Sequence, residues 1–546
     1  GPYINVTIAN NWAPNRGAIY GGSGTVFTNS IIWHNSPSIS PSIVATYSNI
    51  EDNGLPGEGN LNTDPLFVDM YNQDYHLSNS SPCIGAGDST AITAVDLEGN
   101  IRPDPAGSAP DMGAFESPLS VREAGNTYFV SSTGSDTTFG GLIDPFSTIG
   151  RGIEAAWNGD TVIVFPGVYA ENLYIANMSI VLGSQLLLTG DTNYVNITKI
   201  NGGITFDDGV DSAALLSGFT IQNSTTGITC QGNPNLSYLK IQDHSNNGIL
   251  FNGSEASLSH ITLTRNGRGI EGTDSELYFY DIVIDQNNTA GNGAGLNLIG
   301  CLAVLDSVEI TDNVSTNGFG GGMYINSSTI TLSRSKIERN RSDNFDGGGI
   351  YFTTNSSITM ENVSVSENQA NEFGGGLYIG RDINSSFLAS NISITSNECN
   401  EYGAGIYIRG VNDFTLSESR IGGNAAIRRG GGIYCWDAHP ELLNVLISDN
   451  AVTGTGTGDG GGGIYLIESN SDPTLTNVTI VNNTANAGGG IYRYDLDCEP
   501  TLVNTIIWNN IPNSYNIANG GSVTFSDIEG GFAGVGNIND DPLFLD

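Results

Sequence analysis

The sequence predicts an all-β solenoid, in which short strands wind into a coil and stack rung upon rung. One observation is a five-residue repeat, Gly-Gly-Gly-Ile-Tyr or a close variant, that occurs seven times between residues 320 and 492. The tyrosines are separated by 27, 27, 29, 27, 31 and 27 residues, and a period between about 20 and 50 residues is typical of stacked-repeat proteins. The other is length, because 546 residues exceed one ordinary core, whereas a stack grows by adding rungs.

Within each repeat, apolar and polar residues alternate with a period of two, as they do along a half-buried strand. Around Tyr351, for example, Ile350 and Phe352 fall on one face of the strand and Tyr351 on the other. We therefore expect the apolar neighbours to form the core and the tyrosines to face outward, as an aromatic strip of the order of 30 Å. The strip comprises Tyr324, Tyr351, Tyr378, Tyr407, Tyr434, Tyr465 and Tyr492.

Two interpretations of this tyrosine column stay open. Aromatic rings with a polar tip suit sugar rings and protein partners, so the column is a candidate binding strip. Alternatively, the outward tyrosines only stack on one another and shield the sheet beneath them.

About ten residues before each tyrosine lies a second column, made of asparagine. Identical Asn side chains in successive rungs can hydrogen-bond as a ladder, in which each amide donates to the next and satisfies the polar groups of a tight turn. We expect a structural role for this column, which comprises Asn313, Asn340, Asn368, Asn397, Asn424, Asn450 and Asn483.

The domain organisation is predicted as two tandem modules. Residues 1–117 contain the last rungs of a preceding module and its cap, which is rich in Pro, Asp and Gly turn signals. Residues 118–126 form a short polar linker. The second module has an N-terminal cap and first rungs over 127–202, and rungs over 203–546 that stop before a C-terminal cap.

A short helix is expected in the N-terminal cap of the second module. Over residues 148–157, Ile149 and Ile153 share one face, and Ser147 can cap the N-terminus. An Asn-Gly pair then ends the helix. A helix in this position protects the first rung from edge-to-edge association.

Composition excludes several partners. The formal net charge is −39, with only three lysines, so the surface field repels phosphate backbones and anionic lipid. We therefore expect no nucleic-acid partner, and, without a run of about 18 apolar residues, no direct membrane insertion. The six cysteines form no Cys-x-x-Cys pair, which leaves a zinc site unsupported. No cofactor is expected, except that oxygen ligands in acidic loops could hold Ca²⁺.

The repeated Gly-Gly-Gly-Ile-Tyr and Asn-x-Thr-Ile segments resemble right-handed parallel β-helix proteins of the pectate-lyase-like superfamily. The segments Thr127–Asp136 and Asp144–Asn172 resemble the usual start of such modules, including the capping helix. The motifs DPLFVD, DLEGNIRP and DMGAFES resemble the closing segment of bacterial "choice-of-anchor" surface proteins. The resemblance covers nearly the whole chain and implies a right-handed parallel β-helix. It implies no single activity, because the superfamily includes lyases, hydrolases, adhesins and structural proteins.

No catalytic residue is assigned. A polygalacturonase-like member would carry Asn-Thr-Asp, Asp-Asp, Gly-His-Gly and Arg-x-Lys on consecutive rungs, whereas here Asp207-Asp208 stands without the last two motifs. A pectate-lyase-like site would need Ca²⁺-binding acids beside a basic residue that removes a proton. The strongest candidate is a group of arginines near Asp343, Asp346 and Glu367, whose other interpretation is charge pairing across rungs. The group contains Arg334, Arg339, Arg341, Arg381, Arg409, Arg420, Arg428 and Arg429.

These observations favour a non-enzymatic extracellular or cell-surface protein, such as a stalk, adhesin or filament element, that presents a long repetitive surface. Two alternatives stay open. One is a polysaccharide-binding or polysaccharide-degrading β-helix, which as an enzyme would be a lyase or glycoside hydrolase. The other is a self-assembling filament subunit that stacks head to tail. The expected partners are a polysaccharide, another surface protein or copies of the same chain.

Overall fold

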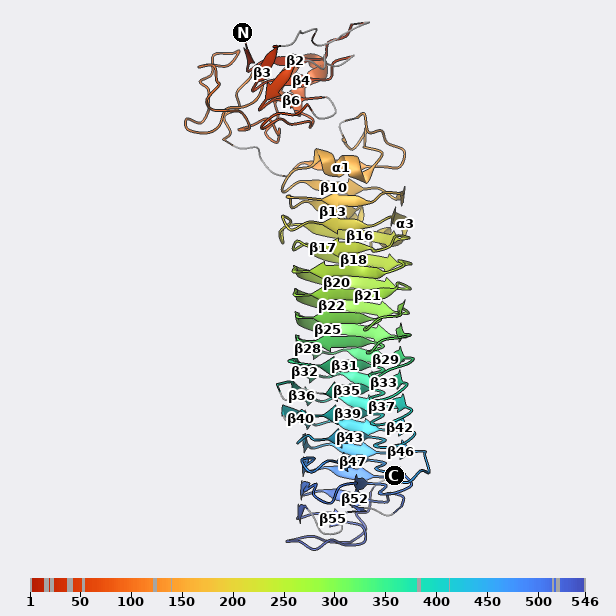
Figure 1. Ribbon diagram of the computed structural model, residues 1–546. Helices are drawn as coiled ribbons and strands as arrows, with labels where there is room; N and C mark the ends of the chain where they lie inside the picture. Colours follow the sequence, from red (N-terminus) through yellow and green to blue (C-terminus); the bar gives the residue numbers. More distant parts are fainter. Residues whose placement is uncertain are drawn as a thin grey trace. The chain divides into compact units, whose positions relative to one another are not determined.

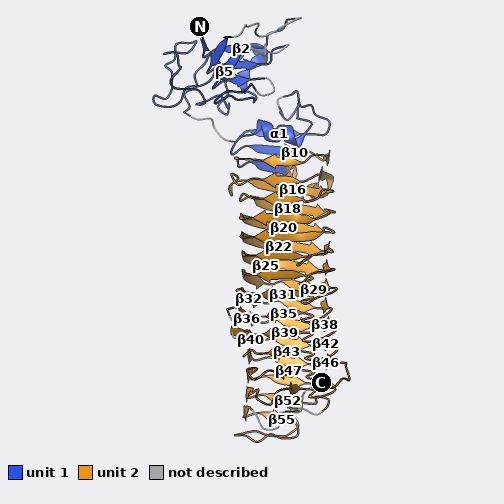
Figure 2. Ribbon diagram, viewed as in Figure 1, with its two compact units in different colours: residues 1–165, 178–183 blue, residues 166–177, 184–546 orange. Residues whose placement is uncertain are grey.

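The computed structural model describes the chain except for a few short segments. Over the described residues the protein is nearly all β, which confirms the predicted class, and it divides into two compact units (Figure 2). Unit 1 comprises residues 1–165 and 178–183, and unit 2 residues 166–177 and 184–546. No helix in the described part of the chain is long and apolar enough to cross a membrane. The described residues are 2–13, 19, 24–36, 43–51, 55–120, 125–138, 140–380, 384–411, 413–512, 515–516 and 521–544.

Unit 1 begins with two small parallel sheets of three strands each. A short antiparallel pair of strands follows, and then a long irregular segment that reaches residue 120. The strands of the first sheet are β1 (Tyr3–Ile4), β3 (Val26–Thr28) and β5 (Val44–Thr46), and those of the second are β2 (Thr7–Ala9), β4 (Ile31–Trp33) and β6 (Asn49–Ile50). The antiparallel pair is β7 (Phe67–Asp69) and β8 (Asp74–Leu77), joined by the 3-10 helix η1 (Met70–Asn72).

The predicted helix is present in unit 1 as α1 (Ile149–Ala155), which packs against the parallel strands β9 (Thr127–Val130) and β10 (Thr161–Val164). The predicted N-cap was wrong by one residue. Thr148 caps the helix, because its hydroxyl accepts the N–H of Arg151 at 3.2 Å. The predicted linker 118–126 is not the division between the compact units, and its residues 121–124 lie outside the described residues.

Unit 2 is a coil in which parallel strands stack rung upon rung (Figure 1). One flat sheet, the tyrosine sheet, contains the Gly-Gly-Gly-Ile-Tyr repeats. Its strands are β12 (Leu173–Ile175), β15 (Ile204–Phe206), β17 (Ile228–Cys230), β19 (Asn247–Asn252), β21 (Arg268–Thr273), β24 (Leu296–Ile299), β27 (Met323–Asn326), β31 (Ile350–Thr353), β35 (Leu377–Gly380), β39 (Ile406–Arg409), β43 (Ile433–Trp436), β47 (Ile464–Ile467), β50 (Ile491–Arg493) and β53 (Tyr515–Asn516).

A second sheet, the bent sheet, follows the tyrosine sheet around each rung. Its early strands are unbroken and lengthen along the coil: β11 (Gly167–Tyr169), β14 (Thr198–Asn201), β16 (Leu215–Gln222), β18 (Asn235–Gln242), β20 (Glu255–Thr264), β22 (Glu276–Asp285) and β25 (Leu302–Thr311). Its later strands are broken in two by a bend: β28 (Thr329–Ser333) and β29 (Lys336–Glu338), β32 (Ser357–Glu361) and β33 (Ser364–Ser366), β36 (Ser386–Ser390) and β37 (Ser393–Thr395), β40 (Asp413–Ser417) and β41 (Arg420–Gly422), β44 (Glu441–Leu443) and β45 (Leu446–Ser448), β48 (Thr474–Thr476) and β49 (Thr479–Val481), β51 (Thr501–Val503) and β52 (Ile506–Trp508), β54 (Ser522–Thr524) and β55 (Asp527–Ile528).

A narrow third sheet completes the middle rungs. Its seven short strands are β23 (Asn288–Thr289), β26 (Val314–Ser315), β30 (Arg341–Ser342), β34 (Gln369–Ala370), β38 (Glu398–Cys399), β42 (Ala425–Ala426) and β46 (Ala451–Val452). Two single-turn helices, α2 (Leu186–Thr189) and α3 (Tyr194–Ile197), interrupt the early rungs of unit 2. Strand β13 (Val181–Ser184) contains the boundary between the units.

The predicted core positions are confirmed. Ile350 and Phe352 are 2% and 1% exposed, and they are in register with Leu377 and Ile379 of the next rung. The glycines that precede the tyrosine sheet form a corner of the coil. A Cβ atom on Gly348 would lie 2.5 Å from the carbonyl oxygen of Gly375, so only glycine allows the rungs to approach this closely.

Candidate functional site

The seven tyrosines of the tyrosine column lie side by side in successive rungs. Each is the register partner of the next, from Tyr324 to Tyr492. The rings stack nearly in parallel: Tyr351 and Tyr378 have ring centroids 4.4 Å apart at 12°, and Tyr378 and Tyr407 are 4.8 Å apart at 11°. The column is therefore a continuous aromatic stack along the coil axis.

The expectation that these tyrosines are exposed was wrong. They do lie on the opposite face of the strand from the core, but five of the seven are buried, and Tyr324 and Tyr492 at the ends are half-buried. The five are Tyr351, Tyr378, Tyr407, Tyr434 and Tyr465, which are 7%, 1%, 1%, 1% and 0% exposed. Burial raises the pKa of the phenols of Tyr407, Tyr434 and Tyr465.

A second layer of side chains covers the tyrosines and explains their burial. It comes from the loops that precede the glycines. Phe373 stacks on Tyr407 with centroids 5.1 Å apart, and Tyr402 stacks on Tyr434 at 4.9 Å. Phe373, Tyr402 and Arg429 also pair with one another in successive rungs through isolated parallel bridges. The covering layer is thus itself in register.

The covering layer has a signal in the sequence that is separate from the five-residue repeat. The residue directly before the first glycine is aromatic in three rungs, at Phe319, Phe373 and Tyr402. In a later rung this position is Arg429, whose guanidinium carbon lies 5.2 Å from the ring of Tyr402 and 5.3 Å from that of Tyr465. A guanidinium between aromatic faces is stabilised by cation–π attraction, so arginine continues the aromatic layer.

The asparagine column forms a hydrogen-bonded ladder. All seven side chains are fully buried. Asn340 is typical: its Nδ2 donates to Asn368 Oδ1 at 3.0 Å and to the carbonyl oxygen of Ile310 at 2.8 Å. Its backbone N–H also donates to Asn368 Oδ1, at 2.9 Å. Each side-chain amide therefore satisfies backbone groups of the preceding rung and joins the two rungs.

The ladder extends beyond the seven predicted asparagines at both ends. Asn266 and Asn287 precede Asn313 in it, and Asn510 follows Asn483, with Nδ2 to Oδ1 distances of 2.9 to 3.0 Å. At the start of the ladder His244 takes the asparagine position, and its backbone N–H donates to Asn266 Oδ1 at 3.1 Å. His244, Asn266 and Asn287 lie in rungs of 21 to 26 residues, where no tyrosine marks the period, and Asn510 lies 27 residues after Asn483.

The arginines of the middle rungs are occupied by partners within the coil. Across rungs, Arg339 Nη2 lies 2.9 Å from Asp312 Oδ2, and Arg428 Nη1 lies 2.9 Å from Glu401 Oε2. Arg409 packs its guanidinium carbon 3.9 Å from the centre of the Trp436 ring. Arg334, Arg341 and Arg420 lie in ion pairs with Asp306, Asp343 and Asp449. Arg381 lies outside the described residues.

Two of the acidic residues considered for catalysis also accept hydrogen bonds within the coil. Asp207 is 7% exposed, and its carboxylate accepts the backbone N–H groups of Asn177 and Gly209 and the hydroxyl of Tyr174. Asp346 accepts the N–H of Phe373 at 3.1 Å. In the part of the chain that the structure describes, no group of three or more His, Cys, Asp or Glu residues is placed to hold a metal ion.

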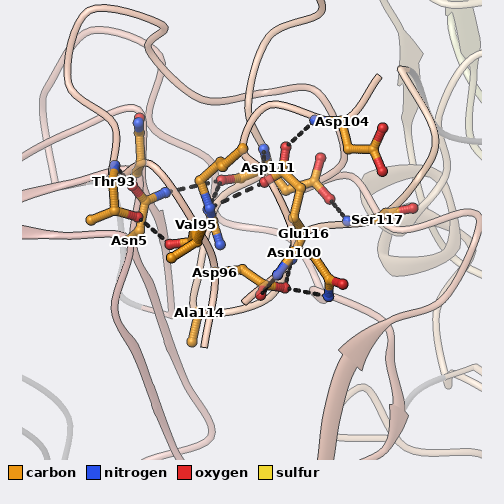
Figure 3. Close-up of polar contacts among 12 residues, drawn as sticks. Asn5, Thr93, Val95, Asp96, Asn100, Asp104, Asp111, Ala114, Glu116 and Ser117 are labelled. Carbon is orange, nitrogen blue, oxygen red and sulfur yellow. Dashed lines mark hydrogen bonds and ion pairs between the residues drawn. The ribbon is translucent and has the colours of Figure 1, made fainter. Parts of the chain in front are cut away.

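A further polar cluster lies in the irregular segment of unit 1 (Figure 3). Arg102 and Glu116 form an ion pair of 3.3 Å with both side chains fully buried. Asp111 accepts the N–H groups of Gly85 at 2.7 Å and Ser117 at 2.6 Å, and burial raises the pKa of its carboxyl to about 7. These acids accept backbone N–H groups that no regular strand satisfies, so the cluster holds the irregular segment together.

Three parallel sheets wound into one coil, with ladders of identical side chains between rungs, define a right-handed parallel β-helix. The family described as "Right handed beta helix region" matches residues 247–438 and 348–528, which together span just over half of the chain. The chain belongs to this right-handed β-helix family. Among curated proteins, none matches the chain.

Several solved structures are similar to this chain. Pectate lyase Pel9A is 12% identical with a TM-score of 0.28, over 56% of this chain and 76% of that one. The A-module of the Azotobacter vinelandii mannuronan C-5 epimerase AlgE6 is 15% identical with a TM-score of 0.33, over 72% and 93%. The GH136 lacto-N-biosidase from Eubacterium ramulus is 11% identical with a TM-score of 0.28, over 73% and 68%. At these values the similarity says nothing of activity.

Proposed function

We propose that this protein is a non-enzymatic structural or adhesive β-helix of the cell surface or extracellular space. In this role unit 2 supplies a stiff, regular surface and carries no catalytic centre. The proposal depends on one observation, which is that other side chains of this chain cover the outer face of the tyrosine sheet. Its outer face, where the repeats place the same residue in every rung, is filled by aromatic and arginine side chains of the preceding loops.

Two further features of unit 2 support a mechanical role. The asparagine ladder and the tyrosine stack both join successive rungs, so a load along the coil is shared by side chains as well as by backbone hydrogen bonds. The tyrosine sheet contains 14 strands, which at about 4.8 Å per strand extends roughly 60 Å along the axis. Stacked repeats that contact only their neighbours commonly provide long binding surfaces.

The charged side chains support the same proposal. General acid–base chemistry needs a group that is free to exchange a proton with a substrate. The arginines of the middle rungs that the structure describes instead lie in ion pairs or against aromatic rings. We propose as partners a polysaccharide, another surface protein or a second copy of this chain.

A catalytic assay tests the proposal directly. The purified protein is incubated with pectin, polygalacturonate, alginate and neutral glucans, with and without Ca²⁺, and new reducing ends and ultraviolet-absorbing unsaturated products are measured. We expect neither product to rise above the protein-free control, while a commercial pectate lyase serves as the positive control. Sustained product formation by this chain would instead establish the polysaccharide-degrading alternative.

Electron microscopy separates the stalk or adhesin from the self-assembling filament. We expect separate short particles at all protein concentrations, with no growth in length. Fibres that lengthen with protein concentration would favour the filament subunit that stacks head to tail.

A further inference from the structure

A groove runs along the outside of the bent sheet, away from the covered face of the tyrosine sheet. It is open, with a volume of about 670 Å³, and it crosses four successive rungs. These rungs contain the broken strands β32 and β33, β36 and β37, β40 and β41, and β44 and β45. Four rungs span about 14 Å along the coil axis. The groove is lined by Asn362, Asn391, Glu418, Asn444, Ser393 and Arg420, among others.

The backbone makes the groove by bending each strand at one residue. Asn362, Asn391, Glu418 and Asn444 occupy the bend in successive rungs, and their φ angles are 57°, 50°, 51° and 56°. This left-handed conformation is one that asparagine adopts more readily than other non-glycine residues. The bend divides each strand in two, and all four side chains are exposed there.

Most of these bend residues form an outer amide ladder, but it is interrupted in the groove. Asn391 donates to Asn362, and further along Asn477 Nδ2 donates to Asn444 Oδ1 at 3.0 Å. Between Asn391 and Asn444 stands Glu418, which makes no side-chain hydrogen bond or ion pair with any described residue. Its carboxylate therefore faces the groove as a free acceptor, at the point where two amide ladders end.

Glu418 and the asparagines on either side of it have hydrogen-bonding atoms without partners among the described residues. On one side the Oδ1 atom of Asn391 accepts no hydrogen bond from the described residues, and on the other the Nδ2 atom of Asn444 donates none. The groove thus presents acceptor, anionic acceptor and donor in consecutive rungs. A repeating ligand with hydroxyl groups, each both donor and acceptor, matches this pattern along the axis.

The charge of the groove and of the chain narrows the ligand class. Among the described residues Glu418 is an unpaired negative charge in the groove, because Arg420 pairs with Asp449, and the chain as a whole carries −39. A polyanion would be repelled by this field. A protein partner would be expected to bury aromatic or large apolar anchors in enclosed pockets, whereas this groove is open.

We propose that this groove binds one strand of an uncharged polysaccharide that lies along the coil axis, with its hydroxyl groups hydrogen-bonded to Asn391, Glu418 and Asn444. The proposal rests on the proposed adhesive function and names its partner class. Hydroxyl donation to Glu418 is a charge-assisted hydrogen bond, which makes Glu418 the residue on which affinity depends most.

Affinity electrophoresis tests the proposal with the whole chain. Gels contain mixed-linkage β-glucan, arabinoxylan or dextran as uncharged polymers, and polygalacturonate or alginate as charged ones. We expect at least one uncharged polymer to retard the protein and both charged ones to leave its mobility unchanged. Retention by none of the uncharged polymers would overturn the proposal.

The decisive variant is Glu418→Asn, which completes the outer amide ladder between Asn391 and Asn444. We expect its apparent Kd to rise about tenfold or more, as for the loss of a hydrogen bond to a charged group. Its melting temperature should stay at or above that of the parent, so that lost retention cannot be assigned to unfolding. Glu398→Gln, an exposed acid outside the groove, is the matched control and should bind as the parent does.

Each of the remaining outcomes would overturn one specific part of the proposal. Unchanged retention of Glu418→Asn would overturn the assignment of the groove, and retention by a polyanion that this variant loses would overturn the uncharged class. Product formation in the catalytic assay would overturn the proposed non-enzymatic function without affecting retention. The two failures are therefore distinguishable.

Discussion

Asparagine is used in two ways in this coil, and burial separates them. In the inner ladder the side chain of Asn368 is fully buried, and it links Asn340, Asn397 and the carbonyl oxygen of Ile337. In the outer ladder the side chain is exposed, and its main contribution is the left-handed backbone conformation at the bend. A buried amide without partners is costly, whereas an exposed amide can bond to water.

The inner and outer asparagines should therefore differ in stability effect. Asn368→Ala leaves the backbone N–H of Asn340 and the carbonyl oxygen of Ile337 without these partners, and each orphaned group costs about 1–3 kcal/mol. We expect the free energy of unfolding to fall by roughly 3 kcal/mol in urea denaturation. Asn391→Ala, at an exposed outer position, should cost only about 1 kcal/mol, because alanine adopts the left-handed conformation less readily than asparagine. Equal losses in the two variants would contradict the distinction.

His244 makes the inner ladder sensitive to pH at its first position. The ring is 2% exposed, with Nδ1 2.8 Å from Ser224 Oγ and Nε2 3.1 Å from the carbonyl oxygen of Ile221. Burial lowers its pKa below the ordinary value of about 6.5. The unfolded chain therefore binds a proton at pH values where the folded chain does not, and stability falls as the pH falls from about 6.5 to the lowered pKa.

His244→Asn should remove this pH dependence, because asparagine fills the same position in the following rungs. We expect the difference in unfolding free energy between parent and variant to shift in favour of the variant as the pH is lowered from about 7.5 to 5. Carboxylates elsewhere titrate in both proteins and cancel in the difference. His439→Asn, at an exposed position, is the control. A difference that does not change with pH would show that His244 carries no such linkage.

At the scale of elements, the alternation of residues predicted the faces of the strands but not their exposure. Ile350 and Phe352 point to the core, and Tyr351 points away from it, as expected. A period of two reports the side of the sheet on which a residue lies, and nothing about what covers that side. The cover comes from loop residues of the preceding rung, such as Phe373 over Tyr407, and the period of two along the strand carries no information about them. Only the aromatic residues before the glycines, Phe319, Phe373 and Tyr402, carried a signal for it.

The covering layer should control chemical access to the tyrosine column. Phe373 stacks on Tyr407, which is 1% exposed. We expect Tyr407 to resist nitration in the parent and to become modified in Phe373→Ala, as measured by peptide mass spectrometry. Tyr174, 61% exposed, should be modified in both proteins and provides the reference. The substitution should cost less than the roughly 3–5 kcal/mol of a fully buried phenylalanine, because Phe373 is half-buried.

Nitration of Tyr407 in the parent at the rate of Tyr174 would contradict this description. It would mean that the loops open readily and that the tyrosine column is accessible as a binding strip after all. The outer groove would then be one of two candidate surfaces, and the Glu418→Asn variant would distinguish them.

At the scale of the whole chain, the repeat period predicted the coil, because each rung must bury its apolar face against the next. The boundary between the compact units was harder to predict from the sequence. The sequence break near residue 118 separates two patterns, whereas the compact units separate after residue 165, since α1, β9 and β10 group with the residues before them. The groove was not predicted, because left-handed residues such as Glu418 have no signature in the pattern of apolar residues.

The charge of the whole molecule makes its stability depend on salt. The chain has 57 acidic and 18 basic residues, so most carboxylates have no basic partner and repel one another. Ion pairs such as Lys336–Glu309 and Arg339–Asp312 act in the opposite direction, but their side chains are about half exposed and contribute little.

Raising NaCl from about 10 to 150 mM shortens the screening length from roughly 30 to 8 Å. Self-repulsion should therefore dominate, and we expect the melting temperature followed by circular dichroism to rise over this range. A melting temperature that falls would mean that the cross-rung ion pairs outweigh the repulsion. A further rise with millimolar CaCl₂ at constant ionic strength would identify a specific Ca²⁺ site.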